Sequence, residues 1–171
     1  MVKNCKEWDK SNIPFCSSLK DEVPEDLVSW KEANEIFKKM VKKDKNFKNI
    51  AYIHFYLDDF LFDGIHGVWF DYNKAYEIIK HFAGIITPDF SIYEDFPLPL
   101  KLWNIYRMRA FGFWCTTLGI NVINNVRWSK DTLDICSQKL RLLQKLMDIC
   151  HKDCSFPSRR NKKKADGGDV Q

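Results

Sequence analysis

Four cysteines near the two ends of the chain are the residues best suited to hold a metal ion. Cys5 and Cys16 lie in the N-terminal segment. Cys150 and Cys154 are four residues apart, so their thiolates can converge on one side of a predicted helix. Four thiolates make a closed tetrahedral zinc site, in which His151 could replace one cysteine. The pattern predicts a structural zinc that joins the termini, and the alternative is four unrelated small thiols.

A second group of polar residues follows the predicted strands. Asp58 and Asp59 follow the first strand, Asp89 and Ser91 the second, and Arg127 the third. Ligands of parallel sheets bind outside the carboxyl ends of the strands, so this group could bind a divalent cation or a phosphate. The same residue types cap helices and shape turns, and we favour that structural interpretation.

No sequence motif of an enzyme accompanies these groups. The chain contains no phosphate-binding glycine loop, no dinucleotide fingerprint, no nucleophile elbow and no zinc-protease motif. His54, His66 and His81 are not spaced as ligands of one metal ion, and His54 lies in an apolar run typical of a core strand. We therefore assign no catalytic residue and predict that the protein is not an enzyme.

Extended and helical patterns alternate along the chain. Ser29 and Glu32 predict a capping box at the start of the first helix, and Gly84 is expected to end a later one. Strands are predicted at 50–57, 85–87 and 120–126, a short extended piece at 68–70, and helices at 71–82, at 100–118 and from residue 129 onward. This alternation predicts an α/β fold, a reduced βα-repeat layer of few mostly parallel strands packed by about four helices.

The helix predicted over residues 100–118 is apolar on nearly every side. Such a helix should be largely buried, its aromatic residues such as Trp103 included. Its two arginines need partners in that setting. We expect Arg107 and Arg109 to pair with Asp89 or Asp95.

The segment over residues 54–129 resembles the family of the domain of unknown function 4417. The runs that carry the resemblance are Phe55–Asp59, Gly84–Leu98, Trp103–Gly112 and Gly119–Trp128. Members of this family are typically carried by phages, prophages and plasmids. The resemblance implies a βα-repeat fold that continues into a further strand and helix, whereas this chain continues with one helical pattern, a Cys/His cluster and a basic tail. It implies no particular activity.

Composition limits the class of protein. Of 171 residues, 45% are hydrophobic and 15% aromatic, which excludes disorder for most of the chain. The net charge is +4, and residues 159–171 hold five cations and two anions, so the rest carries only +1. That profile does not suit a dedicated nucleic-acid-binding domain. We expect one domain over 1–158 and a basic, disordered tail over 159–171 that touches nucleic acid weakly if at all.

The cysteines and the N-terminal residues indicate the cellular compartment of the protein. Six cysteines without a signal-peptide pattern, and without an apolar run long enough for a membrane helix, predict a cytoplasmic protein of a bacterial host. No contact with a membrane is expected.

The function that the sequence favours is a non-enzymatic phage or prophage protein that binds and inhibits a host defence factor. By analogy, its most specific form is an anti-CRISPR inhibitor of a Cas nuclease. The residues expected to contact this partner are Asp58, Asp59, Asp63, Glu94 and Asp95, whose charge suits a basic nucleic-acid channel. Two alternatives stay open, a metal- or phosphate-dependent enzyme at the strand ends and a nucleic-acid-binding accessory protein of a mobile element.

Overall fold

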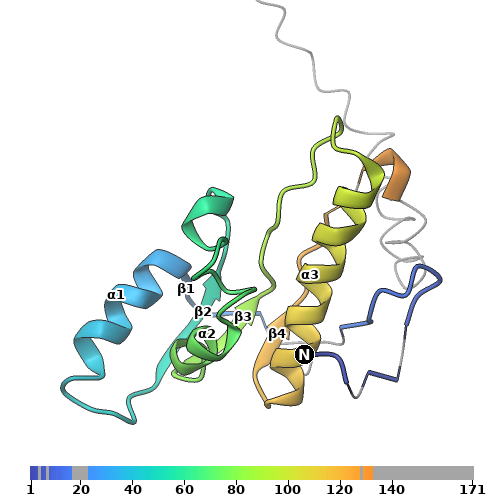
Figure 1. Ribbon diagram of the computed structural model, residues 1–171. Coiled ribbons are helices and arrows are strands. Elements are labelled where there is room, and N and C mark those ends of the chain that lie inside the picture. The colour runs from blue at the N-terminus through green and yellow to red at the C-terminus, as the bar shows by residue number, and fades with distance from the viewer. Residues whose placement is uncertain (4, 7, 17–22, 128, 133–171) are drawn as a thin grey trace, which may run out of the picture. The chain divides into compact units, whose positions relative to one another are not determined.

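The described structure covers residues 1–132 of the computed structural model, apart from residues 4, 7, 17–22 and 128 (Figure 1). Contacts divide the chain into a unit over residues 1–138 and a second unit over 139–171, and every described element belongs to the first. The predicted boundary at residue 158, the basic tail and most of the last predicted helix lie outside the described residues. No helix within the described ranges is long and apolar enough to cross a membrane.

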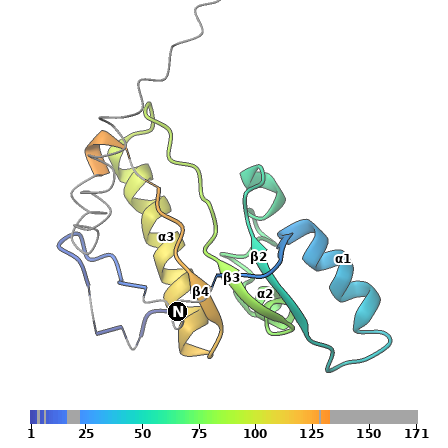
Figure 2. The same cartoon turned by 180° about the vertical axis from the view of Figure 1, so that it is seen from behind.

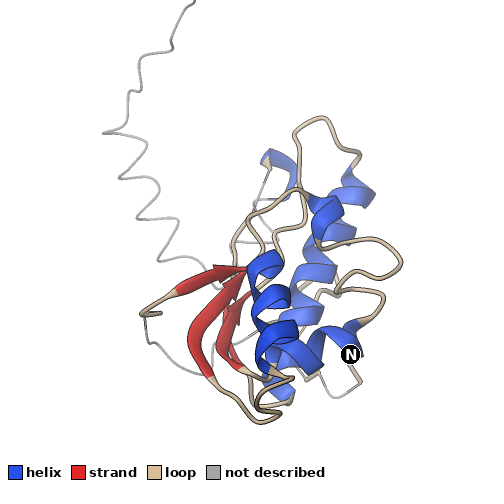
Figure 3. Ribbon diagram, turned by 90° about the vertical axis from the view of Figure 1, so that its left-hand side faces the viewer, coloured by secondary structure: helices blue, strands red, loops and turns tan. Residues whose placement is uncertain are grey.

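Four parallel strands form one sheet, in the order β1-β2-β3-β4. The strands are β1 Leu27–Ser29, β2 Asn49–His54, β3 Phe82–Ile86 and β4 Asn121–Ile123, and the helices between them are α1 Trp30–Met40, α2 Tyr72–Ile79 and α3 Leu98–Thr117. Short 3₁₀ turns cover Asp59–Leu61 and Lys130–Thr132. Because neighbouring strands are consecutive, crossovers of one hand place the helices on one face of the sheet, as Figures 2 and 3 show.

The core lies between this face of the sheet and the helices. Register aligns Val28, Ile53, Ile85 and Val122 in one row across the four strands. This row packs against Ala33 of α1 and against buried side chains of α2 and α3. The α/β fold with parallel strands is therefore confirmed.

The start of α1 also follows the prediction. The Ser29 hydroxyl accepts from the backbone N–H of Glu32 at 3.2 Å, and the Glu32 carboxylate accepts from the Ser29 N–H at 2.8 Å. These reciprocal bonds satisfy two donors that the first turn leaves unpaired. They also lower the pKa of Glu32, because they favour its ionised form.

Two local predictions are wrong. Gly84 lies inside β3, in register with Tyr52 and Asn121, and α2 ends earlier at Ile79. A Cβ on Gly84 would collide with the ring of Tyr52 and lie 2.6 Å from the Asn121 carbonyl oxygen, so the glycine makes room for a neighbouring strand. The extended piece expected at 68–70 consists of turns.

The burial of α3 departs from the prediction as well. Trp103 is 44% exposed, whereas Lys101, Asn104 and Arg107 are buried. The three polar residues are three positions apart, so they share one face of the helix. The loops that cover this face provide hydrogen-bond acceptors for all three side chains, from Glu94, Ser91 and Asp63.

Candidate functional site

The carboxylate of Asp89, which follows β3, is the centre of a polar cluster at the carboxyl edge of the sheet. It accepts a bidentate pair of hydrogen bonds from Arg127, with Nε–Oδ1 at 2.6 Å and Nη2–Oδ2 at 2.7 Å. Asn125 donates to the same carboxylate from its side chain at 2.5 Å, and its backbone N–H donates to the Thr87 hydroxyl. The segment after β4 is thereby held against the segment after β3.

A second carboxylate joins the loops that follow β2 and β3. Asp59 accepts from the backbone N–H of Ser91 at 3.1 Å and from its hydroxyl at 3.0 Å. The carbonyl oxygen of Ser91 in turn accepts from the side chain of Asn104 on α3. The predicted strand-end residues Asp59, Asp89 and Arg127 thus lie at one edge of the sheet, where sequence reasoning expected them.

A stacked aromatic pair lies near this cluster. His54 and Tyr56 stack with ring centroids 5.4 Å apart, and Tyr56 is half-exposed. Burial raises the pKa of the Tyr56 hydroxyl, and the negative charge of Asp89 raises it further. The hydrogen bonds to Asp89 raise the pKa of Arg127, since they favour the charged guanidinium. These shifts stabilise the neutral phenol and the charged ion pair rather than a free base.

The chemistry that the cluster offers is limited by its internal pairing. The carboxylate of Asp89 accepts hydrogen bonds from Arg127 and Asn125, and that of Asp59 accepts them from Ser91. Within the described ranges, no three His, Cys, Asp or Glu side chains are placed to hold one metal ion. The geometry favours the structural interpretation, in which the cluster fixes three loops to one another.

The five acidic residues predicted to contact a partner separate into two kinds. Asp59 is bound by Ser91, and Asp63 forms an ion pair with Arg107, Nη1–Oδ2 at 2.6 Å. The other three, Asp58, Glu94 and Asp95, are exposed. The pairing of Asp63 also shows that the expected partners of the α3 arginines are wrong. Arg107 pairs with Asp63, and Arg109 pairs with the buried Asp9 at 2.9 Å.

Two large apolar side chains are exposed beside these acids. Phe60 is 77% exposed and Tyr93 is 55% exposed. Because Asp59 is bound to Ser91, the loops that carry them lie side by side. We call Asp58, Phe60, Tyr93, Glu94 and Asp95 together the strand-end surface. The sequence predicted the acids of this surface but not its aromatics. Phe60 lies two residues before the buried Phe62, and Tyr93 lies three residues after the buried Phe90, so no residue pattern separates exposed from buried rings.

Buried phenylalanines hold the two loops in place. Phe55, Phe62 and Phe90 are fully buried. The ring of Phe62 lies between the other two, with centroids 5.6 Å from Phe55 and 5.5 Å from Phe90. The guanidinium of Arg107 covers Phe90 at 3.9 Å. Packed, buried aromatic rings therefore support the loops that carry the strand-end surface.

The structure places only half of the predicted zinc site. Cys5 and Cys16 are half-buried, whereas Cys150, Cys154 and the substitute ligand His151 lie outside the described residues. The sulfur of Cys16 packs close to Gly112 on α3, and burial raises the pKa of this thiol to about 12. A metal ion would have to overcome that preference for the protonated thiol. The zinc site stays a prediction.

The N-terminal segment that carries these two cysteines is anchored to α3. The carboxylate of Asp9 accepts from the backbone N–H groups of Ser11 and Ile13 and from Arg109. Ile13 is buried. The Asp9–Arg109 ion pair and the buried side chains of Ile13 and Pro14 therefore hold this segment against the rest of the fold.

Comparison with known proteins identifies the family. The sequence matches a domain of unknown function (DUF4417) over residues 9–146. The Gene 1 protein of Mycobacterium phage L5 is 32% identical over 117 residues, which cover 68% of this chain and 47% of the phage protein. The Gene 1 protein of Mycobacterium phage D29 is 34% identical over 85 residues, which cover 49% of this chain and 30% of the phage protein.

The chain thus spans about half, or less, of the length of these relatives. No solved structure matches it. Since the family match covers most of the sequence, the chain belongs to the DUF4417 family, as the four runs of resemblance predicted.

Proposed function

We propose that this DUF4417 protein is encoded by a phage or prophage, does no chemistry, and binds a host defence protein through its strand-end surface. The most specific form of the proposal is inhibition of a Cas nuclease. The observation that carries it is the pairing of Asp59 with Ser91, which brings two loops with exposed aromatics and acids into one surface.

The composition of the surface indicates the kind of partner. Phe60 and Tyr93 are large apolar groups of the type that dominates binding energy at protein interfaces. Asp58, Glu94 and Asp95 surround them with negative charge. A partner with a basic, partly apolar groove, such as the nucleic-acid channel of a nuclease, is complementary to both features.

The organisation of the sheet edge supports binding rather than catalysis. The strand-end carboxylates Asp59 and Asp89 are held in hydrogen bonds to Ser91 and Arg127. A general base or a metal ligand needs a carboxylate that can reach the substrate or the ion. Here the carboxylates fix the loops, and the exposed side chains are left for recognition.

The direct test measures DNA cleavage by a guide-loaded Cas nuclease in the presence of the full chain. The surface variant carries Asp58→Asn, Glu94→Gln and Asp95→Asn. Its matched control removes three exposed acids elsewhere, by Glu25→Gln, Glu35→Gln and Glu77→Gln. The parent and the control should inhibit cleavage, and the surface variant should need at least about tenfold more protein.

A second pair of variants tests the apolar part. Phe60→Ala removes an exposed ring from the strand-end surface, and Ile50→Ala removes an exposed side chain from β2. Only the first should weaken inhibition. Affinity capture from a bacterial lysate extends the test to other defence factors, with the surface variant as the negative arm. If the parent and the surface variant recover the same proteins, and the purified chain hydrolyses a substrate, the proposal is wrong.

A further inference from the structure

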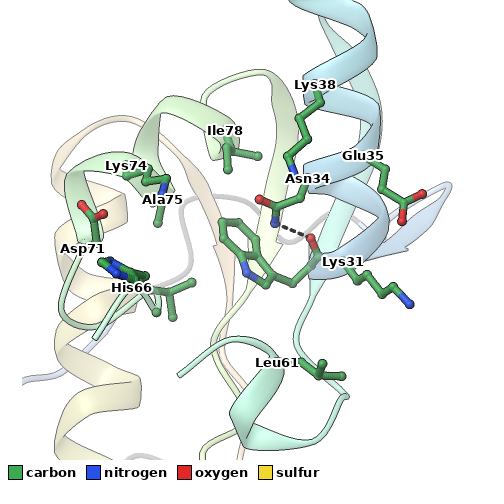
Figure 4. Close-up of a pocket in the computed structure, with 13 residues that line it drawn as sticks. Lys31, Asn34, Glu35, Lys38, Leu61, His66, Asp71, Lys74, Ala75 and Ile78 are labelled. Atoms are coloured by element: carbon green, nitrogen blue, oxygen red, sulfur yellow. Dashed lines mark hydrogen bonds between the residues drawn. The ribbon is translucent and has the colours of Figure 1, made fainter. Parts of the chain in front are cut away.

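A groove of about 430 Å³ opens between α1 and α2 (Figure 4). Its volume lies in the range of pockets that hold small molecules. Trp30, Val68, Ala75 and Ile78 form its apolar lining, and all four are buried side chains of the core. Trp30 stacks on Phe55 at 5.4 Å, so its indole is held in a fixed position.

Lysines of both helices bring positive charge to the groove. Lys38 of α1 and Lys74 of α2 line it from opposite sides, and Lys31 and Glu35 line its rim. Figure 4 shows Lys38 extending towards α2, whereas the ends of Lys31 and Glu35 point outward. In the part of the chain that the structure describes, neither Lys38 nor Lys74 lies within ion-pairing distance of a carboxylate. Two unpaired ammonium groups on facing helices favour an anion between them.

Three further polar groups complete the lining. The side-chain amide of Asn34 donates to the Trp30 carbonyl oxygen at 2.7 Å, and Figure 4 shows its own oxygen facing the groove. This oxygen is a fixed acceptor above the indole. His66 and Asp71 lie beside each other at the opposite side. The groove therefore combines an anion site, an aromatic surface and an oriented carbonyl.

We propose that this groove binds a purine nucleoside monophosphate. The phosphate lies between Lys38 and Lys74, where two ammonium groups make charge-assisted hydrogen bonds to it. The base packs on the apolar lining at Trp30, and its ring N–H or amino group donates to the Asn34 oxygen. Asp71 and His66 face the ribose hydroxyls. This site shares no residue with the strand-end surface, and it does not depend on the function proposed for that surface.

The sequence contained a signal for this groove. Trp30, Asn34 and Lys38 recur every four residues, so they share one face of α1. The facing lysine on α2 is 36 residues from Lys38, and only the fold brings the two together.

Titration calorimetry of the full chain with AMP and with GMP tests the site. At least one of the two should bind saturably at one site. Binding should change the tryptophan fluorescence of the parent, and Trp30→Phe should remove this change. The double variant Lys38→Met/Lys74→Met should weaken binding at least about tenfold, because it removes two charge-assisted hydrogen bonds. The control Lys42→Met/Lys45→Met makes the same double charge change at exposed lysines that do not line the groove, and it should leave binding unchanged.

Adenosine and inorganic phosphate separate the two halves of the ligand. Each should bind more weakly than AMP. If inorganic phosphate binds as tightly as AMP, the site takes a free anion and the assignment of the base is wrong. If adenosine binds as tightly, the role of the lysines is wrong. Absence of binding by both nucleotides, or an equal affinity of the parent and a folded double variant, would refute the site.

Discussion

Replacing Arg107 by methionine should destabilise the fold by several kcal/mol. The guanidinium links α3 to the loop after β2 through Asp63, at 2.6 Å, and it donates to the Asn104 side chain at 2.7 Å. It also lies 3.9 Å from the ring centroid of Phe90. One residue thus joins the helix to both loops of the strand-end surface.

The expected magnitude follows from the burial of the pair. The Arg107 side chain is 9% exposed and that of Asp63 is 20% exposed. Removing one partner of a buried pair costs about 3–5 kcal/mol, because the remaining charge is left without compensation. Asp63 keeps some contact with water, so we expect the lower end, about 3 kcal/mol. For a chain of this size that corresponds to a fall in melting temperature of about 6–12 °C.

Urea denaturation of a double-mutant cycle tests this reasoning. The variants are Arg107→Met, Asp63→Asn and the combination of both. The combination removes the orphaned charge, so it should be less destabilised than the sum of the single variants, by about 1–3 kcal/mol. The Asp63 Oδ1 and Arg107 Nε atoms are buried without a hydrogen-bond partner among the described residues. Arg107→Met therefore also removes one unsatisfied donor, which keeps its cost at the lower end of the range. Strict additivity, or a change below about 0.5 kcal/mol in Arg107→Met, would refute it.

Three further predictions concern the sheet and the cysteines. Gly84→Ala should cost about 2–3 kcal/mol in urea denaturation, because the new methyl group meets the Tyr52 ring, and an unchanged midpoint would contradict this. In protein freed of metal by a chelator, burial raises the pKa of Cys16 to about 12 from 9.0, so the contribution of this thiol to stability is complete below pH 9 and is lost towards pH 12. Cys16→Ser should therefore flatten the fall in melting temperature over that window. Protein purified without chelator should contain about one zinc per chain by elemental analysis, and Cys5→Ser should lose it, whereas a metal-free parent would remove the zinc hypothesis.

The elements that the sequence predicted well are those whose signals are local. The capping box of Ser29 and Glu32 lies within four residues, and it placed the start of α1 correctly. The strand β1 immediately before it, Leu27–Ser29, was not predicted. Three residues are too few for a periodic pattern, and β1 is a strand because it pairs with β2, about twenty-five residues further along.

The wrong predictions have a common physical cause. Gly84 fits the local rule for a residue that ends a helix, yet its place is decided by Tyr52 on the neighbouring strand. On α3, both Trp103 and Lys101 have long apolar parts, so composition alone does not say which is covered. Lys101 is buried because the carbonyl oxygen of Glu94 and the carboxylate of Asp131 accept from its ammonium group, at 2.8 Å each.

The sequence predicted which residues lie at the candidate site, but it did not predict which of them pair with one another. The rule that polar groups gather at the carboxyl ends of parallel strands identified Asp59, Ser91, Asp89 and Arg127. Which carboxylate binds which donor depends on pairs separated by 32 and 38 residues. These pairings decide whether a carboxylate can contact a ligand. The same residues could therefore form a ligand site or a structural cluster, depending on how they pair.

The rigidity of the loops explains how a small surface could bind a partner tightly. An exposed aromatic ring on a mobile loop loses conformational entropy when it is bound, which reduces affinity. Phe60 lies between Asp59, which is hydrogen-bonded to Ser91, and Phe62, which is fully buried. Its backbone is therefore fixed on both sides before any partner arrives. The internal pairs that occupy the Asp59 and Asp89 carboxylates are the same contacts that hold the loops of the strand-end surface in one conformation.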